Sequence, residues 1–552
     1  MSLLLRFACL FWVALSALLP VASQAQIPGV TWANGGGGTH ATYSRIAYTT
    51  GVTSDAAGNS YVTGYFSDTL TLGTFRLVSQ GSYDLYVAKL DAAGHYQWAA
   101  QATSLRLDTS NGIALDNAGN VYITGYTEAY ELDFGPYKLT NPGFGAALYV
   151  AQLSPAGTWQ RATLASSPSN TFSYTVSNAL AVDKAGAVYV TGGLNGTVAF
   201  GSTRLTNGGY GTFVAKLGPT GTWEWATIAG GIYDFGHAIA LDQAGNPYIT
   251  GYFESTQVKF GTFTLTNRGA GDIFVAKLTA AGTWQWVAQG GGRDTDYGFG
   301  IVVDPAGNAY VTGGTGEKTP RFGTLAPIKA DNSRDLFVAK LDVAGTWQWV
   351  ALGGSAGLDT GTGIILQGNT LTVAGSLGGP TARFGTLAPL AVSGDADVGV
   401  IQLDTDGQWQ WALATGGAGS DYAEGLAAGP QGEARVVGFF RASSATFGIT
   451  TLAGGASDKA AHVSDSQFVL AVAELAQRSP AGFTLWPNPS HGTVYATGLE
   501  AGQPVQVFDS RGRLVVADAR QAYEAYGLAL PTLAAGMYIL RCGSQTRKLV
   551  IY

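Results

Sequence analysis

Five aspartates recur at one position of a repeated sequence pattern, where their carboxylates could bind cations. Each stands eight residues before the end of an apolar strand motif: Asp108, Asp234, Asp296, Asp359 and Asp421. A ring of such side chains could attract cations or hold a hard ion such as calcium through oxygen ligands. Carboxylates that recur with a repeat also serve structurally, by accepting N–H bonds from a glycine-rich connection such as Gly291 and Gly292. Both interpretations stay open.

His237 is the one histidine that lies beside an acid in this pattern, three residues after Asp234. An acid and a histidine this close are a minimal candidate for proton transfer. The chain has no Gly-x-Ser-x-Gly, no His-Glu-x-x-His and no phosphate-binding loop with lysine. The sequence therefore assigns no catalytic residue and no metal ligand, and His237 joins the five aspartates as a candidate for ligand binding.

These candidates lie on a repeat of about sixty residues that occurs seven times between residues 30 and 475. A clear copy has four strand motifs, at residues 238–242, 247–252, 273–278 and 283–287. Apolar and polar residues alternate in each motif, as expected of half-buried strands. Four strands per repeat predict an all-β, seven-bladed β-propeller over residues 26–475.

The two ends of the repeat region are incomplete in complementary ways. A tryptophan strand around Trp32 comes before any complete repeat, and the last third strand, from Phe468, has no tryptophan strand after it. We expect residues 30–33 to supply the missing outer strand of the seventh blade, because a closed ring leaves few strand edges unpaired.

The paired tryptophans of the fourth strand motif, such as Trp223 with Trp225 and Trp284 with Trp286, allow two interpretations. In a lectin their flat faces would stack on sugar rings. On outer strands they would instead fill the space between blades, which the repeat favours.

The pattern Ala-Leu-Asp-x-Ala-Gly-Asn-x-Tyr-x-Thr-Gly, followed by Phe-Val-Ala-Lys-Leu and Gly-Thr-Trp-Gln-Trp, resembles the bacterial seven-bladed β-propeller repeat family. Five copies match well, whereas the sixth and seventh have Gln367 and Gly429 in place of the turn aspartate. The resemblance implies a fold and no single activity.

A separate region follows the repeats. Residues 476–482 have the composition of a linker, and residues 483–552 alternate strand patterns with Pro and Gly turns, which predicts a small β-sandwich. This region resembles the type A C-terminal sorting domain of the type IX secretion system. Its hallmarks are present in order: Trp486, Pro487, Asn488, Pro489, then Asp509, Gly512, Arg513, then Gly536, Tyr538 and Lys548. The resemblance implies handling by the type IX secretion machinery and transfer across the outer membrane.

The N-terminal segment predicts an exported protein, and the charge and the hydropathy pattern narrow its partners. Residues 1–25 have Arg6, an apolar run and a small-residue end, as in a secretory signal peptide. A net charge of −7 offers no basic stripe for nucleic acid, and no later apolar run predicts a transmembrane segment.

We therefore expect a secreted or cell-surface module for binding or adhesion, with a glycan or a protein as ligand and no cofactor other than calcium. The competing functions are a polysaccharide lyase or hydrolase with its site at the channel mouth, and a purely structural surface component.

Overall fold

The computed structural model describes residues 27–36, 47–453 apart from short gaps (169–170, 317–318, 327, 329–333, 431, 442–443 and 449), 466–475, and the strands and a few adjoining residues between 484 and 551. Every helix or strand in these residues is a β-strand, as the all-β prediction required. In the part of the chain described here, no helix could cross a membrane. The chain divides into two compact units, Met1–Glu474 and Leu475–Tyr552. The signal peptide predicted for residues 1–25 and the linker predicted for residues 476–482 lie outside the described residues.

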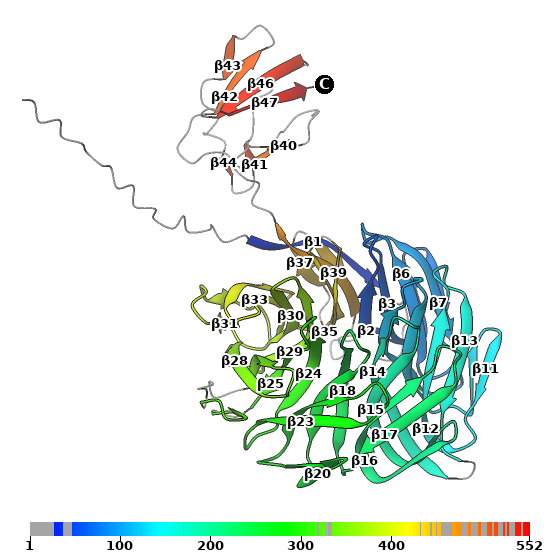
Figure 1. Cartoon of the computed structure of the whole chain (residues 1–552). Coiled ribbons are helices and arrows are strands. Elements are labelled where there is room, and N and C mark those ends of the chain that lie inside the picture. The colour runs from blue at the N-terminus through cyan, green and yellow to red at the C-terminus, as the bar shows by residue number, and fades with distance from the viewer. Residues whose placement is uncertain are drawn as a thin grey trace, which may run out of the picture. The chain divides into compact units, whose positions relative to one another are not determined.

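Unit 1 is built from antiparallel sets of four strands, which we call sheets and number 1 to 7 along the chain (Figure 1). Sheet 1 has β2 (Ala47–Ser54), β3 (Ser60–Phe66), β6 (Asp84–Leu90) and β7 (Tyr96–Ala102). Sheet 2 has β8 (Asp108–Leu115), β9 (Val121–Thr127), β12 (Phe144–Leu153) and β13 (Trp159–Ala165). Sheet 3 has β14 (Phe172–Val182), β15 (Val188–Phe200), β16 (Thr203–Leu217) and β17 (Trp223–Ala229). Sheets 2 and 3 are also joined by a short parallel pairing between β12 and β14. Sheet 4 has β18 (Asp234–Leu241), β19 (Pro247–Phe253), β22 (Asp272–Leu278) and β23 (Trp284–Gly291).

The remaining sheets repeat this order. Sheet 5 has β24 (Tyr297–Val303), β25 (Ala309–Thr315), β27 (Asp335–Leu341) and β28 (Trp347–Gly354). Sheet 6 has β29 (Thr360–Gln367), β30 (Thr370–Leu377), β33 (Asp397–Asp404) and β34 (Trp409–Thr415). Sheet 7 has β35 (Ser420–Ala428), β36 (Ala434–Arg441), β39 (Ser466–Leu475) and, as its outer strand, β1 (Ile27–Gly36) from the start of the chain.

Short strands join the second and third strands of most sheets. They form the hairpins β4 (Thr69–Leu72) with β5 (Phe75–Val78), β10 (Glu131–Phe134) with β11 (Tyr137–Thr140), β20 (Gln257–Phe260) with β21 (Phe263–Thr266), and β37 (Ser444–Phe447) with β38 (Thr450–Ala453). In sheet 5 the corresponding segment is β26 (Arg321–Phe322), which pairs with β23 of sheet 4. In sheet 6 it is β31 (Thr381–Phe384), which pairs with β28 and with β32 (Leu390–Ala391).

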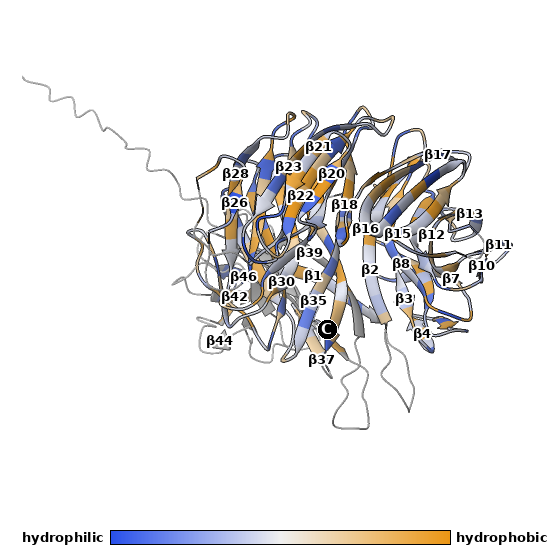
Figure 2. Cartoon of the chain, turned by 90° about the horizontal axis from the view of Figure 1, so that it is seen from below, coloured by the Kyte–Doolittle hydropathy of each residue, from blue (hydrophilic) through white to orange (hydrophobic). Residues whose placement is uncertain are grey.

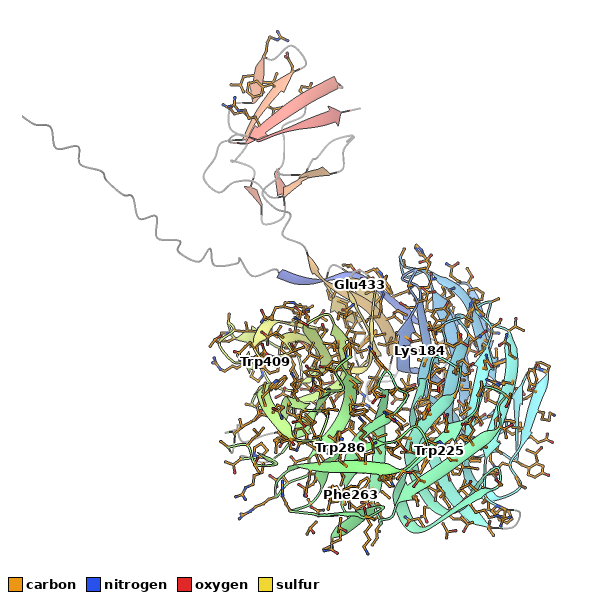
Figure 3. All side chains as sticks on the ribbon, viewed as in Figure 1. Lys184, Trp225, Phe263, Trp286, Trp409 and Glu433 are labelled. Carbon is orange, nitrogen blue, oxygen red and sulfur yellow. The ribbon has the colours of Figure 1, made fainter. Side chains whose placement is uncertain are left out.

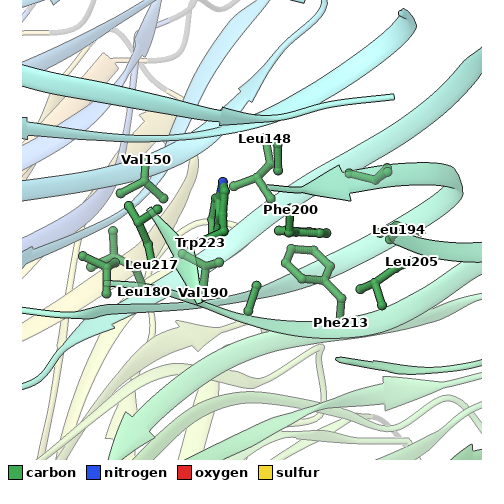
Figure 4. Close-up of a cluster of buried hydrophobic side chains, with 14 of the residues drawn as sticks. Leu148, Val150, Leu180, Val190, Leu194, Phe200, Leu205, Phe213, Leu217 and Trp223 are labelled. Atoms are coloured by element: carbon green, nitrogen blue, oxygen red, sulfur yellow. The ribbon is translucent and has the colours of Figure 1, made fainter. Parts of the chain in front are cut away.

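The apolar faces of neighbouring sheets enclose the core. Figure 4 shows the cluster between sheets 2 and 3, where Leu148 and Val150 meet Val190, Phe213 and Trp223. The second and third strands of a sheet bury side chains on both faces, as in β6 and β19, whereas the outer strands β7 and β17 are largely half-buried. Figure 2 shows hydrophobic and hydrophilic residues interspersed along the strands. The cluster between the last sheet and the first contains Val437 and Val469 with Val52 and Tyr86, and Trp32 packs against it. Sheets 7 and 1 are therefore neighbours.

Tryptophans of the outer strands join successive sheets, as the packing interpretation required. The indole Nε1 of Trp225 donates to Ala280 O of sheet 4 at 3.1 Å, and that of Trp286 donates to Val343 O of sheet 5 at 3.1 Å. Figure 3 labels both tryptophans. Trp32 of β1 makes the same bond to Ala92 O of sheet 1 at 3.1 Å. These indoles are held between sheets, so a role in stacking on sugars is not supported for them.

The structure of the turns between the first two strands accounts for their Asp-x-x-Gly-Asn sequence. Asp242 Oδ1 accepts the N–H groups of Ala244 and Asn246 at 3.0 and 2.9 Å, and Oδ2 accepts Asn246 Nδ2 at 2.9 Å. Gly245 has a φ of 78°, a conformation that favours glycine.

Unit 2 consists of β-strands in its described part. A four-stranded sheet has the order β43 (Leu514–Val516), β42 (Val505–Asp509), β46 (Gly536–Cys542) and β47 (Gln545–Ile551). Two further pairs join β40 (Thr484–Trp486) with β41 (Tyr495–Thr497), and β44 (Tyr523–Glu524) with β45 (Gly527–Leu528).

Candidate functional site

The five repeat aspartates begin the inner strands and are completely buried. Asp108 and Asp234 are the first residues of β8 and β18, Asp296 and Asp359 directly precede β24 and β29, and Asp421 is the second residue of β35. All five have 0% of their surface exposed. They therefore form no open ring of charge at a channel mouth, which the ligand-binding interpretation would need.

Their hydrogen bonds hold the connections between sheets. Asp296 accepts Gly292 N at 2.7 Å, Thr315 Oγ1 at 2.6 Å and Gly316 N at 3.0 Å. Asp234 accepts two backbone N–H groups and the Ser255 hydroxyl, the last at 2.9 Å. These contacts support the structural interpretation, in which each aspartate orders the chain that enters its inner strand.

A second set of buried aspartates faces the first. Asp84, Asp272, Asp335 and Asp397 begin the third strands of sheets 1, 4, 5 and 6. A Cβ added to Gly291 would lie 2.5 Å from both Asp272 Oδ1 and Asp296 Oδ2, so both carboxylates approach this glycine. Among the described residues no three His, Cys, Asp or Glu side chains gather as a metal site. The calcium site stays a prediction.

Burial raises the pKa of the repeat aspartates. The pKa of Asp108 rises to about 7, and the pKa values of Asp234, Asp296 and Asp421 rise to about 6. Loss of solvation is the main cause, and the neighbouring Asp272 and Asp397 add to it for Asp296 and Asp421.

The residues that converge on one cavity come from a different position of the repeat. Each inner strand has a β-bulge, where one residue is left out of the pairing with the second strand. The bulge residues are Thr50, Asn111, Asn178, His237, Phe299, Thr362 and Glu424. All seven line a single cavity of about 550 Å³, which we call the central cavity.

Hydrogen bonds between sheets hold most of these side chains in place. Each of them donates to the carbonyl oxygen that precedes the bulge of the next sheet. The bonds are Asn111 Nδ2 to Ser177 O at 2.9 Å, Asn178 Nδ2 to Gly236 O at 2.9 Å, Thr362 Oγ1 to Ala423 O at 2.9 Å, and Thr50 Oγ1 to Ser110 O. The bulge therefore turns these polar groups toward the cavity and toward the neighbouring sheet.

His237 and Glu424 are the ionisable bulge residues. Burial lowers the pKa of His237 to about 4, and its Nδ1 has no hydrogen-bond partner. The Glu424 side chain is exposed to the cavity, yet protein surrounds the cavity closely and loss of solvation raises its pKa to about 7. At neutral pH the cavity therefore holds an uncharged imidazole and a partly protonated carboxyl.

A connected series of aromatic rings lies around the same end of the inner strands. We call it the aromatic rim: Tyr126, Tyr174, Tyr210, Tyr233, Phe235, Tyr252, Tyr297 and Phe299. Tyr210 stacks on Phe235 with centroids 5.0 Å apart, and Tyr233 is 54% exposed. The His237 imidazole joins the rim through Phe299 at 4.7 Å.

Sequence reasoning found His237 and missed the other cavity residues. Glu424 and Asn111 share no residue type with His237, so no motif marks the position. The available signal was variability: the bulge residue differs between most copies while small residues flank it, as in Gly236 and Ala238.

Comparisons with known proteins identify both regions of the chain. Residues 97–133 and 285–317 match the family model described as "Beta-propeller repeat", and residues 484–551 match "Secretion system C-terminal sorting domain". The chain therefore carries β-propeller repeats and a secretion system C-terminal sorting domain. Its sorting domain is of the type IX kind and indicates export to the cell surface or the extracellular space.

The chain spans about a third or less of the length of the curated relatives that it matches. It is 26% identical over 184 residues to a WD repeat-containing protein of Acanthamoeba polyphaga mimivirus, an alignment that covers 29% of this chain and 13% of that protein. It is 23% identical over 326 residues to the regulatory protein FlaEY of Caulobacter vibrioides, covering 55% of this chain and 33% of that protein. The polysaccharide lyase Uly1 is a similar solved structure, with a TM-score of 0.38, 9% identity, and coverage of 77% of this chain and 89% of that one.

Part of the sorting motif lies in described strands of the repeat protein. Arg513 Nε donates to Asp509 Oδ2 at 2.8 Å, and Arg513 N donates to Asp509 Oδ1 at 3.0 Å. Gly536 and Tyr538 lie on β46, and Lys548 lies on β47. Trp486 ends β40, whereas Pro487, Asn488, Pro489 and Gly512 lie outside the described residues.

Proposed function

We propose that sheets 1 to 7 are the blades of a seven-bladed propeller closed by β1, and that unit 2 is a small sandwich. We also propose that the propeller binds an extracellular glycan. The glycan would lie over the central cavity and the aromatic rim. The main support for glycan binding is that seven bulge residues, which differ between most sheets, line one cavity.

The chemistry of this surface suits a carbohydrate. Sugar rings offer apolar C–H faces and a rim of hydroxyl groups. The exposed ring of Tyr233 and the rings stacked beneath it supply flat apolar faces. The cavity is lined by polar side chains, among them Asn111, Asn178 and the exposed Glu424.

A polysaccharide-active enzyme is the second candidate, because Glu424 has a pKa of about 7 in the same cavity as His237. A carboxyl with that pKa can both give and accept a proton near neutral pH. A lyase or hydrolase would lose turnover in Glu424→Gln, whereas a binding module would keep most of its affinity in that variant.

The test is a glycan array probed with the full chain, followed by titration of any bound glycan. Tyr252→Ala and Tyr233→Ala should each weaken binding about tenfold, the effect of losing one stacking ring of 1–1.5 kcal/mol. Tyr137→Ala is the control, since Tyr137 lies on β11 and belongs to no part of the aromatic rim. Binding of a protein ligand with no glycan would refute the proposal, and failure to bind any ligand would favour a structural surface role.

A further inference from the structure

A second cavity, of about 560 Å³, is lined by three arginines. Its lining residues are Arg268, Gly292, Arg293, Thr319 and Arg321, and we call it the arginine pocket. The chain as a whole has a net charge of −7 and only 30 basic residues among 552. Among the described residues that line the pocket, three are arginines and none is an acid, so this part of the lining is basic in a chain that is acidic overall.

The backbone fixes the places of these three arginines. Ala270 N donates to Arg293 O at 3.0 Å, which ties the loop before β22 to the connection between sheets 4 and 5. Arg321 pairs with Gly291 in the β23–β26 ladder, and Arg268 Nη1 donates to Arg321 O at 3.2 Å. A Cβ at Gly269 would lie 2.1 Å from Arg293 O, so glycine is needed for this close approach. The pocket is thus assembled by three different connections.

Two aspartates close to the pocket, Asp272 and Asp296, are buried and bonded to other groups, whereas Asp294, next to Arg293, is exposed. Asp272 Oδ2 accepts the backbone N–H of Arg268 at 2.6 Å and Gln289 Nε2 at 2.7 Å. Asp296 accepts hydrogen bonds from Gly292 N, Thr315 Oγ1 and Gly316 N. Both carboxylates are buried, while all three arginine side chains are exposed. Guanidinium groups so placed form bidentate hydrogen bonds with planar or tetrahedral oxyanions.

The arginine pocket belongs to the same end of sheets 4 and 5 as the aromatic rim. Arg293 stands four residues before Tyr297, a ring of that rim. The Arg334 guanidinium lies 5.0 Å from the centre of the Tyr297 ring and lines the central cavity, so a further positive charge borders the proposed glycan site.

We propose that the arginine pocket binds the sulfate or carboxylate groups of an acidic polysaccharide. The inference rests on the proposed function and narrows its ligand to an anionic glycan. A polymer with charges at intervals would place one charged group in the pocket while its neighbouring sugars lie against the aromatic rim. Nucleic acid is disfavoured, because the net charge of the chain would repel a phosphate backbone beyond this one pocket.

The test measures binding of the full chain to dextran sulfate, polygalacturonate, neutral dextran and a short DNA duplex, at low and high salt. We expect at least one of the two acidic polysaccharides to bind, and binding to weaken about tenfold or more in Arg268→Ala/Arg321→Ala, as expected for the loss of charge-assisted bonds. Arg383→Ala is the matched control, because Arg383 pairs with Gly354 as Arg321 pairs with Gly291. That control should retain its affinity within about twofold.

The outcomes separate the two proposals. Sulfate-only or carboxylate-only binding that needs Arg268 and Arg321 supports the inference and identifies the anion. Glycan binding whose affinity is unchanged in Arg268→Ala/Arg321→Ala overturns the inference and leaves the proposed function in place. Binding of DNA with the same arginine dependence, or equal losses in Arg383→Ala, also overturns it. Unchanged melting temperatures of the variants show that the pocket and not the fold was altered.

Discussion

The His237 imidazole lies parallel to the Phe299 ring, with centroids 4.7 Å apart and planes 4° apart. These two residues occupy the bulges of neighbouring inner strands, so the stack joins sheets 4 and 5 at the central cavity. His237 also lies 5.3 Å from the Tyr252 ring. An imidazole surrounded by rings loses solvation when it is protonated, which is why its pKa falls to about 4.

Protonation of His237 should therefore destabilise the fold. The folded-state pKa is below the unfolded value of 6.5, so this stabilising contribution is present above pH 6.5 and is lost as the pH falls through about 4. The full difference is on the order of 3 kcal/mol. His237→Gln should show a smaller loss of unfolding free energy than the wild type between pH 6.5 and 4, measured by urea unfolding. Parallel losses in both proteins would contradict the assigned pKa.

The buried aspartates predict the opposite pH dependence. Their folded-state pKa values of about 6 to 7 exceed the ordinary 3.8, so their contribution is present below pH 3.8 and is lost as the pH rises through 6 to 7. Asp421→Asn should reduce the loss of stability between pH 5 and 8 by about 1–3 kcal/mol. Chelator is added to every sample except the one that receives calcium. Equal slopes in mutant and wild type would refute the prediction, and restoration of the wild type by calcium at pH 8 would show that these carboxylates hold the ion.

The sequence predicted the strands well, because local rules determine them. Period-two alternation marks residues 273–278 as β22, and the offset of Trp32 from the other tryptophans placed β1 beside β39. The candidate site was predicted poorly. Asp296 is buried beneath the connection whose backbone N–H group at Gly292 it binds. This burial is a consequence of tertiary structure, and the spacing of the repeat does not predict it. The bulge residues lie about sixty residues apart, and only the bulges bring Glu424 and His237 into one cavity.

Glycines in the turns between the third and fourth strands should be sensitive to substitution for two reasons. Gly282 has a φ of 85°, and a Cβ there would lie 2.7 Å from Trp225 Cε3. Gly282→Ala should lower the free energy of unfolding by about 2–4 kcal/mol, from backbone strain together with displacement of the indole. Gly432→Ala is the control, since its φ is 91° with nothing within 4 Å, and should cost about 1 kcal/mol. Equal costs would mean that the indole moves freely.

Removal of the Trp32 side chain should loosen the strand that completes sheet 7. Its indole bonds to Ala92 O, and the Arg435 guanidinium lies 5.1 Å from the ring. Trp32→Ala should lower stability by about 3 kcal/mol and promote self-association, because release of β1 exposes the edge of β39. Trp286→Ala removes the same kind of bond from an internal sheet and should destabilise without association. Light scattering of the two variants tests this, and equal association would argue against closure by β1.

The turn formed by Asp509 and Arg513 provides a test of the sorting motif that separates recognition from stability. The ion pair is at the surface, with Arg513 73% exposed, so its loss should change stability by less than about 1 kcal/mol. Arg513→Ala should nevertheless reduce the amount of protein at the cell surface several-fold if the guanidinium is read by the secretion machinery. His95→Ala is the matched control, since Asp91 and His95 form the same i, i+4 turn within unit 1, with Nδ1 and Oδ2 3.3 Å apart. Wild-type surface levels of Arg513→Ala would show that this arginine serves only the turn.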